Sequence, residues 1–388
     1  MTEYSGLTAG LDIGDKMSEI CLLDEQGEVI ERKRIASTAQ SLTKYFSQFD
    51  AIRIALESGF HSPWMSRLLE DLGHQAVVAN SRRVALIAKN GKKSDKVDAE
   101  LLARLARSDL VLLSPIQHRS EEHQKEIAVV RARDALVRSR TLMVNHVRGV
   151  VKSSGQRLPS TSTSRFHKLE DQLPDALRPA LSPLMSSIKE VNERIAELDK
   201  EIESLCAKYS ACEIFRSIPG VGPVTALFFL LCIEDPHRFK RNRNVGAYLG
   251  MTPRKHQSGD DDPELRITRM GNTYLRRLLV NAAHYVLGPF GPDSELRRFG
   301  LKLAARGRKR AKKKASVAVA RKLAVLMNAL WKTGELFEAF PSKQRGSCNS
   351  LEQGIDSSAG ARDGRDISKG VASAHPAPDR QAIALVER

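Results

Sequence analysis

The stretch that decides the fold is residues 7–35, LTAGLDIGDKMSEICLLDEQGEVIERKRI. Its apolar runs are interrupted by the turn Asp24–Gly27, in which the glycine permits a tight hairpin. Short apolar runs on either side of turn residues are typical of β-strands. We therefore predict three consecutive antiparallel strands, over residues 7–13, 19–23 and 29–35.

The residues that follow alternate between strand and helix patterns. Apolar runs at 52–56 and 76–79 predict two more strands, and helical spacing predicts helices over 63–72 and 96–107. Three antiparallel strands followed by strand, helix, strand and helix is the order of an RNase H-like (RuvC-like) α/β domain. We place this domain at residues 1–112.

Composition limits the classes of protein to which this chain of 388 residues can belong. It has 62 Lys and Arg against 46 Asp and Glu, a formal charge of +16, which favours a polyanionic partner and nucleic acid first. The longest apolar run, Val224–Ile233, is far shorter than the ~20 residues of a membrane span. Five scattered cysteines without a CxxC pair argue against structural zinc and a disulfide scaffold. We expect a cytoplasmic protein with no membrane contact.

The rest of the chain is predicted to be helical. Residues 113–210 contain an apolar stripe with coiled-coil spacing, which must be buried against another helix of this chain or of a second copy. A second α-helical domain is predicted over 211–338. Residues 339–388 are predicted to be a disordered tail, because no aromatic residue occurs after Phe340. The stripe consists of Leu184, Ile188, Val191, Ile195, Leu198, Ile202 and Leu205.

Four acidic residues of the first domain are candidates for a metal site. Asp12 ends the first predicted strand, Glu57 follows the strand at 52–56, and Asp95 and Asp98 share one face at the start of a helix. Each could instead be a helix cap or a solvated charge. In an RNase H-like sheet these elements adjoin, so the four carboxylates could converge. Their repulsion would then require a hard divalent cation, Mg²⁺ or Mn²⁺, which can polarise a phosphate.

Two loops and one basic helix are candidates for binding nucleic acid. Ser258 lies beside a glycine in the loop 252–260, although a plain surface turn is the simpler interpretation. Gly220 and Gly222 resemble the hairpin of helix-hairpin-helix modules, with an ordinary helix–helix turn about equally favoured. Basic side chains gather around the serine loop and along 297–322, a run without an acid. The candidates are Arg254, Lys255, Arg266, Arg269, Arg276, Arg277, Arg308, Arg310, Lys312, Lys313 and Lys314.

These motifs together resemble the insertion sequence one-ten family of transposases, which is related to the Piv DNA invertases. GLDIG at 10–14, ALESG at 55–59 and KSDKVDA at 93–99 are similar to its DEDD signature. IPGVGP at 218–223 and MGNTYLRR at 270–277 are similar to its C-terminal domain. The resemblance covers about residues 7–335, with the five motifs in the family's order.

The resemblance implies a fold, a chemistry and partners. A RuvC-like domain would be joined by a coiled-coil region to a serine-bearing domain. Asp12, Glu57, Asp95 and Asp98 would bind Mg²⁺, and Ser258 would attack a DNA phosphate and hold it covalently until strand exchange. Family members act on double-stranded donor and target DNA, are guided by a structured non-coding RNA, and assemble their site from different subunits. A dimer or tetramer is therefore expected.

Two other functions remain open from the residues themselves. A RuvC-type endonuclease or junction resolvase would use the four carboxylates to activate water, and Ser258 would then be incidental. A non-catalytic relic would bind nucleic acid through its basic helices alone. The three alternatives differ in whether Ser258 and Asp12 are needed for DNA cutting.

Overall fold

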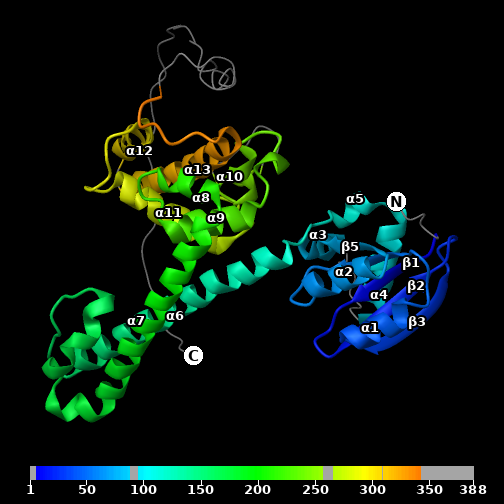
Figure 1. Cartoon of the computed structure of the whole chain (residues 1–388), viewed down its shortest axis with the longest axis horizontal. Coiled ribbons are helices and arrows are strands. Elements are labelled where there is room, and N and C mark those ends of the chain that lie inside the picture. Colours follow the sequence, from blue (N-terminus) through cyan, green and yellow to red (C-terminus); the bar gives the residue numbers. More distant parts are fainter. Residues whose placement is uncertain (1–5, 88–94, 257–264, 308, 342–388) are drawn as a thin grey trace, which may run out of the picture. The chain divides into compact units, whose positions relative to one another are not determined.

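The computed structural model describes residues 6–87, 95–256, 265–307 and 309–341 (Figure 1). The described residues up to Ala339 belong to one unit of the chain. Residues 342–388 of the predicted tail lie outside the described residues, so the disorder of that tail stays a prediction.

Five strands form a mixed sheet in the order β3-β2-β1-β4-β5. β2 pairs antiparallel with β1 and β3, whereas β4 is parallel to both β1 and β5. The predicted succession of three antiparallel strands and two further strands is confirmed, with β1 central and β4 beside it. The strands are β1 (Thr8–Asp12), β2 (Met17–Leu23), β3 (Val29–Ala36), β4 (Arg53–Glu57) and β5 (Gln75–Ala79).

Helices cover both faces of this sheet, because side chains along each strand alternate between two apolar cores. On one face, Leu11 and Leu56 pack with α1 and α2, and on the other face Ala55 packs with α4. Helices α2 and α4 match the two predicted ones, whereas α1 and α3 were not predicted. The helices are α1 (Ala39–Phe46), α2 (Ser62–Asp71), α3 (Ser81–Ile87), α4 (Asp95–Ser108) and the single turn α5 (Leu110–Leu113).

The backbone of α4 lies directly on β1 at Gly10. A β-carbon added to Gly10 would lie 1.9 Å from the carbonyl oxygen of Ala99 and 2.6 Å from the amide nitrogen of Ala103. A residue with any side chain would therefore force the helix and the strand apart. Glycine at this position sets how closely α4 approaches the strand that ends at Asp12.

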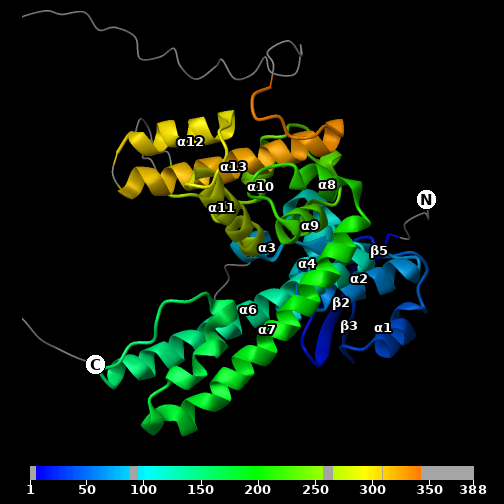
Figure 2. The same ribbon diagram turned by 60° about the vertical axis from the view of Figure 1, so that its left-hand side comes forward.

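Two long helices, α6 (Glu121–Ser153) and α7 (Arg178–Ala207), form an antiparallel hairpin and run side by side in Figures 1 and 2. The Arg140 guanidinium donates to Oδ1 of Asn192 at 2.7 Å across the hairpin. Within the same chain, Ile188 of the stripe packs with Val144 and Val147 of α6, whereas Ile202 and Leu205 belong to the core of the helical region. The sequence alone left the partner of this stripe open. The buried members of the stripe are Ile188, Ile195, Ile202 and Leu205. Between the two helices lie the 3-10 segments Thr163–Gln172 and Asp175–Leu177.

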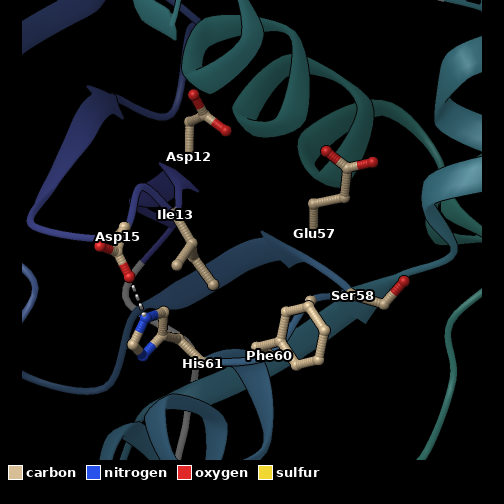
Figure 3. A pocket seen from close by; sticks show the side chains of 8 residues that line it. Asp12, Ile13, Asp15, Glu57, Ser58, Phe60 and His61 are labelled. Carbon is tan, nitrogen blue, oxygen red and sulfur yellow. Dashed lines mark ion pairs between the residues drawn. The ribbon is translucent and has the colours of Figure 1, made fainter. Parts of the chain in front are cut away.

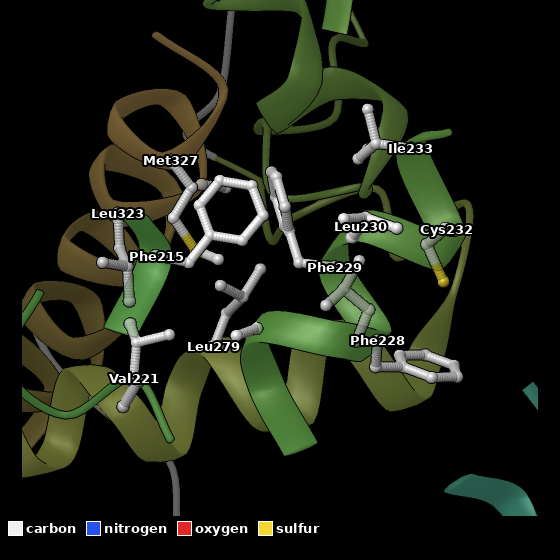
Figure 4. Close-up of a cluster of buried hydrophobic side chains, with 14 of the residues drawn as sticks. Phe215, Val221, Phe228, Phe229, Leu230, Cys232, Ile233, Leu279, Leu323 and Met327 are labelled. Atoms are coloured by element: carbon white, nitrogen blue, oxygen red, sulfur yellow. The ribbon is translucent and has the colours of Figure 1, made fainter. Parts of the chain in front are cut away.

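The remaining described residues of this unit form a helical region, as predicted. Helix α9 (Pro223–Ile233) lies at its centre, with every residue from Thr225 to Ile233 buried (Figure 4). The ring of Phe229 packs edge-to-face on Phe215, with centroids 5.2 Å apart. No described helix is both long and apolar enough to cross a membrane. The other helices are α8 (Ser210–Arg216), α10 (Asn244–Tyr248), α11 (Thr273–Leu287), α12 (Glu295–Ala305) and α13 (Lys309–Thr333), with a 3-10 turn at Pro236–Arg238.

Replacing Gly10 by alanine should destabilise the fold, because the new methyl group must displace the backbone of α4. We expect the free energy of unfolding, measured by chemical denaturation, to fall by about 1–3 kcal/mol. Gly149 of α6 is the matched control, since no described atom lies within 4 Å of a β-carbon added there. Gly149→Ala should stabilise its helix by about 0.5–1 kcal/mol. Equal stability of the two variants would contradict the close packing of α4 on β1.

Candidate functional site

Two of the four predicted carboxylates come together at the ends of adjacent strands. β1 and β4 are parallel and in register, with Gly10 opposite Ala55 and Leu11 opposite Leu56. The same register places Asp12 beside Glu57, at a strand spacing of about 4.8 Å. Both side chains are half-buried and line one open pocket of about 290 Å³ (Figure 3).

The pleat of the strands decides which way these two carboxylates point. Leu11 and Leu56 enter the core beneath α1 and α2, so their neighbours face the opposite side of the sheet. That side is the one on which α4 packs, at Gly10 and Ala55. Figure 3 shows the carboxylates of Asp12 and Glu57 extending in the same direction.

Asp95 and Asp98 lie in the first turn of α4, on the same side of the sheet. The Arg53 guanidinium, at the start of β4, donates to the carbonyl of Ala106 near the other end of α4, at 3.1 Å. Helix α4 therefore runs opposite to β4, and its first turn lies toward the strand ends that hold the acid pair. Asp95 is exposed, Asp98 is half-buried, and neither lines the pocket of Asp12.

The oxygen donors of these acids match a hard divalent cation, although the four predicted carboxylates do not all lie together. Carboxylate oxygens are the donors that Mg²⁺ and Mn²⁺ prefer. Asp12 and Glu57 supply such donors from a rigid pair of strands. Within the described parts of the chain, no three His, Cys, Asp or Glu side chains are grouped closely enough to hold a metal ion. The pair fits one side of a metal site, and the two acids of α4 do not complete it in this arrangement.

The loop after β4, which forms the rim of the pocket, is tightly hydrogen-bonded. Ser58 Oγ lies 3.0 Å from Ser81 Oγ of α3. The buried Ser62 Oγ accepts from the amide of Gly59 at 2.9 Å and lies 2.9 Å from Nε2 of His118. Burial lowers the pKa of His118, so its ring is neutral at pH 7 and suited to this uncharged contact. The rim therefore has a fixed backbone.

Two residues of this rim, Phe60 and His61, are not among the site residues predicted from the sequence. His61 makes two contacts. Its Nδ1 accepts from the indole N–H of Trp64 at 3.1 Å, and its Nε2 lies 3.6 Å from Asp15. Because an indole N–H can only donate, the neutral ring has its proton on Nε2. Phe60, next to it, also lines the pocket. Their position directly after Glu57 is the signal that could have identified both.

Ser258, the predicted nucleophile, lies outside the described residues, but both flanks of its loop are described. Pro253 and Ile267 form an antiparallel bridge. The amide of Arg254 donates to the carbonyl of Arg266 at 3.0 Å, one step further into the loop. The chain therefore enters and leaves the serine loop through one short two-stranded base.

Two glycines allow the turns on either side of this loop to touch. Gly250 and Gly271 both have positive φ, at 65° and 74°. A β-carbon on Gly250 would lie 2.1 Å from the carbonyl oxygen of Met270, and one on Gly271 would lie 2.1 Å from that of Tyr248. The backbones of the two turns therefore lie in direct contact.

Arg276, predicted to bind nucleic acid, turns inward instead. Its residue is only 9% exposed, and its guanidinium donates to the carbonyls of Leu249 at 2.8 Å and Met270 at 2.7 Å. Burial lowers its pKa, as expected for a charge withdrawn from water. The side chain joins the two turns and is not available to a phosphate, which corrects the prediction for this residue.

The other predicted basic residues have several different environments. Arg277 is exposed, but its guanidinium forms an ion pair with the buried Asp134 and lies over the ring of Tyr274 at 4.9 Å. Arg308 lies outside the described residues. The other exposed members of the set are Arg254, Lys255, Arg266, Arg269, Arg310, Lys312, Lys313 and Lys314.

Gly220 and Gly222 lie in the turn between α8 and α9 and differ in their surroundings. Gly220 has a φ of +86°, and a β-carbon there would lie 2.9 Å from the carbonyl of Ala282 in α11. Glycine at position 220 therefore allows this turn to pack closely against α11. Gly222 is exposed at the start of α9, an end of a helix that favours anions. Gly222 is therefore the more exposed of the two, since Gly220 is half-buried.

Two protein-family models match most of the motifs described above. A model described as the transposase IS116/IS110/IS902 family matches residues 212–296. A second model, described as a transposase and named for the DEDD transposases of IS110, matches residues 9–155. The first range contains the glycine turn and the serine loop, and the second contains the acid pair.

The chain is also similar over most of its length to curated proteins. It is 28% identical over 332 residues to the transposase for insertion sequence element IS1111A of Coxiella burnetii, covering 83% of this chain and 88% of the relative. It is 28% identical over 279 residues to that for element IS1328 of Yersinia enterocolitica, covering 71% and 82%. It is 26% identical over 275 residues to a pilin gene-inverting protein of Moraxella lacunata, covering 68% and 75%.

The inward position of Arg276 predicts an effect on stability. Arg276→Met keeps the apolar stem but leaves the carbonyls of Leu249 and Met270 without their donor. We expect the free energy of unfolding to fall by about 2–3 kcal/mol. The control is Arg254→Met, at an exposed position of the loop base, which should change it by no more than about 0.5 kcal/mol. Equal effects in chemical denaturation would contradict the structural role of Arg276.

Proposed function

Because the chain belongs to the IS110/IS116 family of transposases, we propose that it cuts and rejoins DNA through Ser258, assisted by a divalent cation. The observation that supports this proposal best is the pairing of Asp12 and Glu57 at the ends of two adjacent parallel strands, in one pocket. A family of DNA-processing enzymes needs such a place for a phosphate, and paired carboxylates on a rigid sheet can provide it.

The proposed cation would be held by oxygen donors of the RuvC-like domain. Asp12 and Glu57 form the fixed half of this site, and Asp95 and Asp98 of α4 are proposed as the other half. Mg²⁺ or Mn²⁺ bound there would polarise a DNA phosphate and stabilise the oxygens that attack and leave it. The position of α4 on Gly10 supports this division, because its first turn lies on the side of the sheet that bears the acid pair.

Ser258 is proposed as the nucleophile of a two-step exchange. Its hydroxyl loses a proton and its Oγ forms a bond to phosphorus, while one P–O ester bond of the DNA breaks and the departing sugar oxygen gains a proton. In the second step the hydroxyl of another DNA end attacks the same phosphorus and releases Ser258. A free serine hydroxyl is a weak nucleophile, so the reaction needs positive charge nearby. The exposed Arg254, Lys255 and Arg266 at the loop base are suited to supply it.

The choice of DNA is proposed to come from a structured guide RNA, with the protein holding nucleic-acid backbones. The exposed basic residues of α13 and the exposed Gly222 are the proposed backbone contacts. We propose functional divisions at 1–112, 113–210 and 211–338, with the site shared between subunits of a dimer or tetramer. A pilin gene-inverting protein, by its name, inverts a gene, and similarity to it supports rejoining as well as cutting.

Two substitutions test this chemistry. The assay contains the purified chain with the RNA that copurifies with it, and its substrate is the DNA that flanks this gene in its genome. Ser258→Ala should abolish the covalent protein–DNA adduct on denaturing gels and also strand exchange. Asp12→Asn should lower both by roughly 100-fold or more while DNA binding persists. The matched control is Asp15→Asn, an exposed acid of the same pocket that has no role in the proposal and should retain most of the activity.

The same experiment separates the alternatives. DNA cutting that persists in Ser258→Ala but stops in Asp12→Asn would replace the recombinase with a RuvC-type nuclease that uses water. Binding without cutting in the unmodified chain would leave only a nucleic-acid-binding relic.

The basic start of α13 should contribute to affinity through phosphate contacts. Lys312, Lys313 and Lys314 are exposed, whereas Ala315 and Val319 on the other face are buried. Replacing the three lysines by glutamine should reduce the slope of log affinity against log salt concentration by about one unit for each lost phosphate contact. The control variant removes three exposed positive charges elsewhere, from Lys152, Lys189 and Lys200 of the α6–α7 hairpin. Unchanged affinity at low salt would mean that the basic face of α13 is only solvated.

A further inference from the structure

The rim of the acid pocket presents an aromatic side chain to solvent. Phe60 is 103% exposed, the most exposed of the large apolar side chains in the described residues. It lines the same pocket as Asp12 and Glu57 and follows Glu57 by three residues (Figure 3). A second exposed phenylalanine, Phe290 at 81%, lies in the helical region, between α11 and α12.

Single exposed apolar residues are common on protein surfaces and by themselves indicate nothing. Phe60 differs because its backbone is held in place from both sides. Gly59 donates to Ser62 Oγ at 2.9 Å, and the amide of Ser58 donates to the carbonyl of Ala79 at 3.0 Å. On the other side, His61 is held by the indole N–H of Trp64. The loop thus presents the ring at a fixed place beside the acid pair, at little further cost in backbone entropy.

The chemistry of the pocket limits what this ring can contact. The lining combines the carboxylates of Asp12, Asp15 and Glu57 with one exposed aromatic ring. Phenylalanine has no hydrogen-bonding group, so it cannot bind a phosphate or a sugar hydroxyl. It can stack on a nucleobase, which every nucleotide next to a bound phosphate supplies, and such stacking does not depend on sequence.

We propose that Phe60 stacks on a base of the DNA strand whose phosphate lies at Asp12 and Glu57. The inference rests on the proposed function, since it needs that strand to enter the pocket. A base stacked on Phe60 cannot stack fully on its neighbour, so the DNA is locally unstacked beside the cleaved phosphate. Phe60 is then a positioning residue: it fixes which phosphodiester bond faces the acid pair and does not take part in bond breaking.

Photochemical cross-linking tests this contact directly. 5-Iododeoxyuridine would be placed in turn at each position around the cleaved bond, and the full chain with its copurified RNA irradiated with Ca²⁺ in place of Mg²⁺. A halogenated base cross-links efficiently to an aromatic side chain on which it is stacked. We expect one position next to the cleaved bond to cross-link to the peptide that contains Phe60, as identified by mass spectrometry.

Three variants complete the test. Phe60→Ala should lose this cross-link and cut DNA roughly 5- to 100-fold more slowly, the range typical of a lost base stack. Phe60→Trp should restore both, because another aromatic ring can stack, whereas a purely structural role would not be rescued by the larger side chain. Phe290→Ala, which removes an exposed phenylalanine far along the chain from Glu57, should behave as the unmodified protein.

The outcomes separate this inference from the function on which it rests. Formation of the Ser258 adduct together with no DNA cross-link at Phe60, or with unchanged cutting by Phe60→Ala, would overturn the stacked base alone. A cross-link at Phe60 that forms only with 5-iodouridine in the RNA would also overturn it. A Phe60–DNA cross-link in a chain that forms no adduct would overturn the serine chemistry and leave the stacked base standing.

Discussion

The parallel, in-register pairing of β1 with β4 is the constraint on which the rest of this site depends. It places two carboxylates, Asp12 and Glu57, on neighbouring strands and on the same face. Like charges held this close repel one another, so the arrangement costs stability unless a counter-charge offsets it. Asp12 and Glu57 are nevertheless both half-buried at the ends of adjacent strands, which is the arrangement that the proposed cation would stabilise.

The acid pocket and the serine loop, the two candidate halves of the site, share one feature. In both, a glycine allows two backbone segments to lie in direct contact. Gly10 lets α4 lie on β1, and this contact fixes how close the helix comes to the strand that ends at Asp12. Gly250 and Gly271 let two turns touch beside the serine loop, and the buried Arg276 links their carbonyls. Backbone contacts of this kind have little freedom to shift, which suits the proposed role of holding a phosphate in one position.

The positive charge of the chain serves several purposes. Arg276 and Arg277 stabilise the helical region through backbone carbonyls and a buried aspartate, and Arg140 crosses the hairpin to Asn192. The described basic residues of the loop base and of the start of α13, by contrast, are exposed. A count of Lys and Arg therefore overstates the nucleic-acid surface, because a guanidinium with five donors is equally useful inside a protein.

The sequence by itself determined the order of strands and helices, because hydrophobic period and turn residues are local properties. It also identified Asp12 and Glu57, since an acid at the end of an apolar strand is visible without coordinates. Only the tertiary structure decided that Arg276 points inward, that the stripe of α7 packs against other helices of the same chain, and that Phe60 is exposed beside the acids. The reason is that the burial of a side chain depends on which distant segments of the chain pack against it, and a local sequence pattern does not predict those segments.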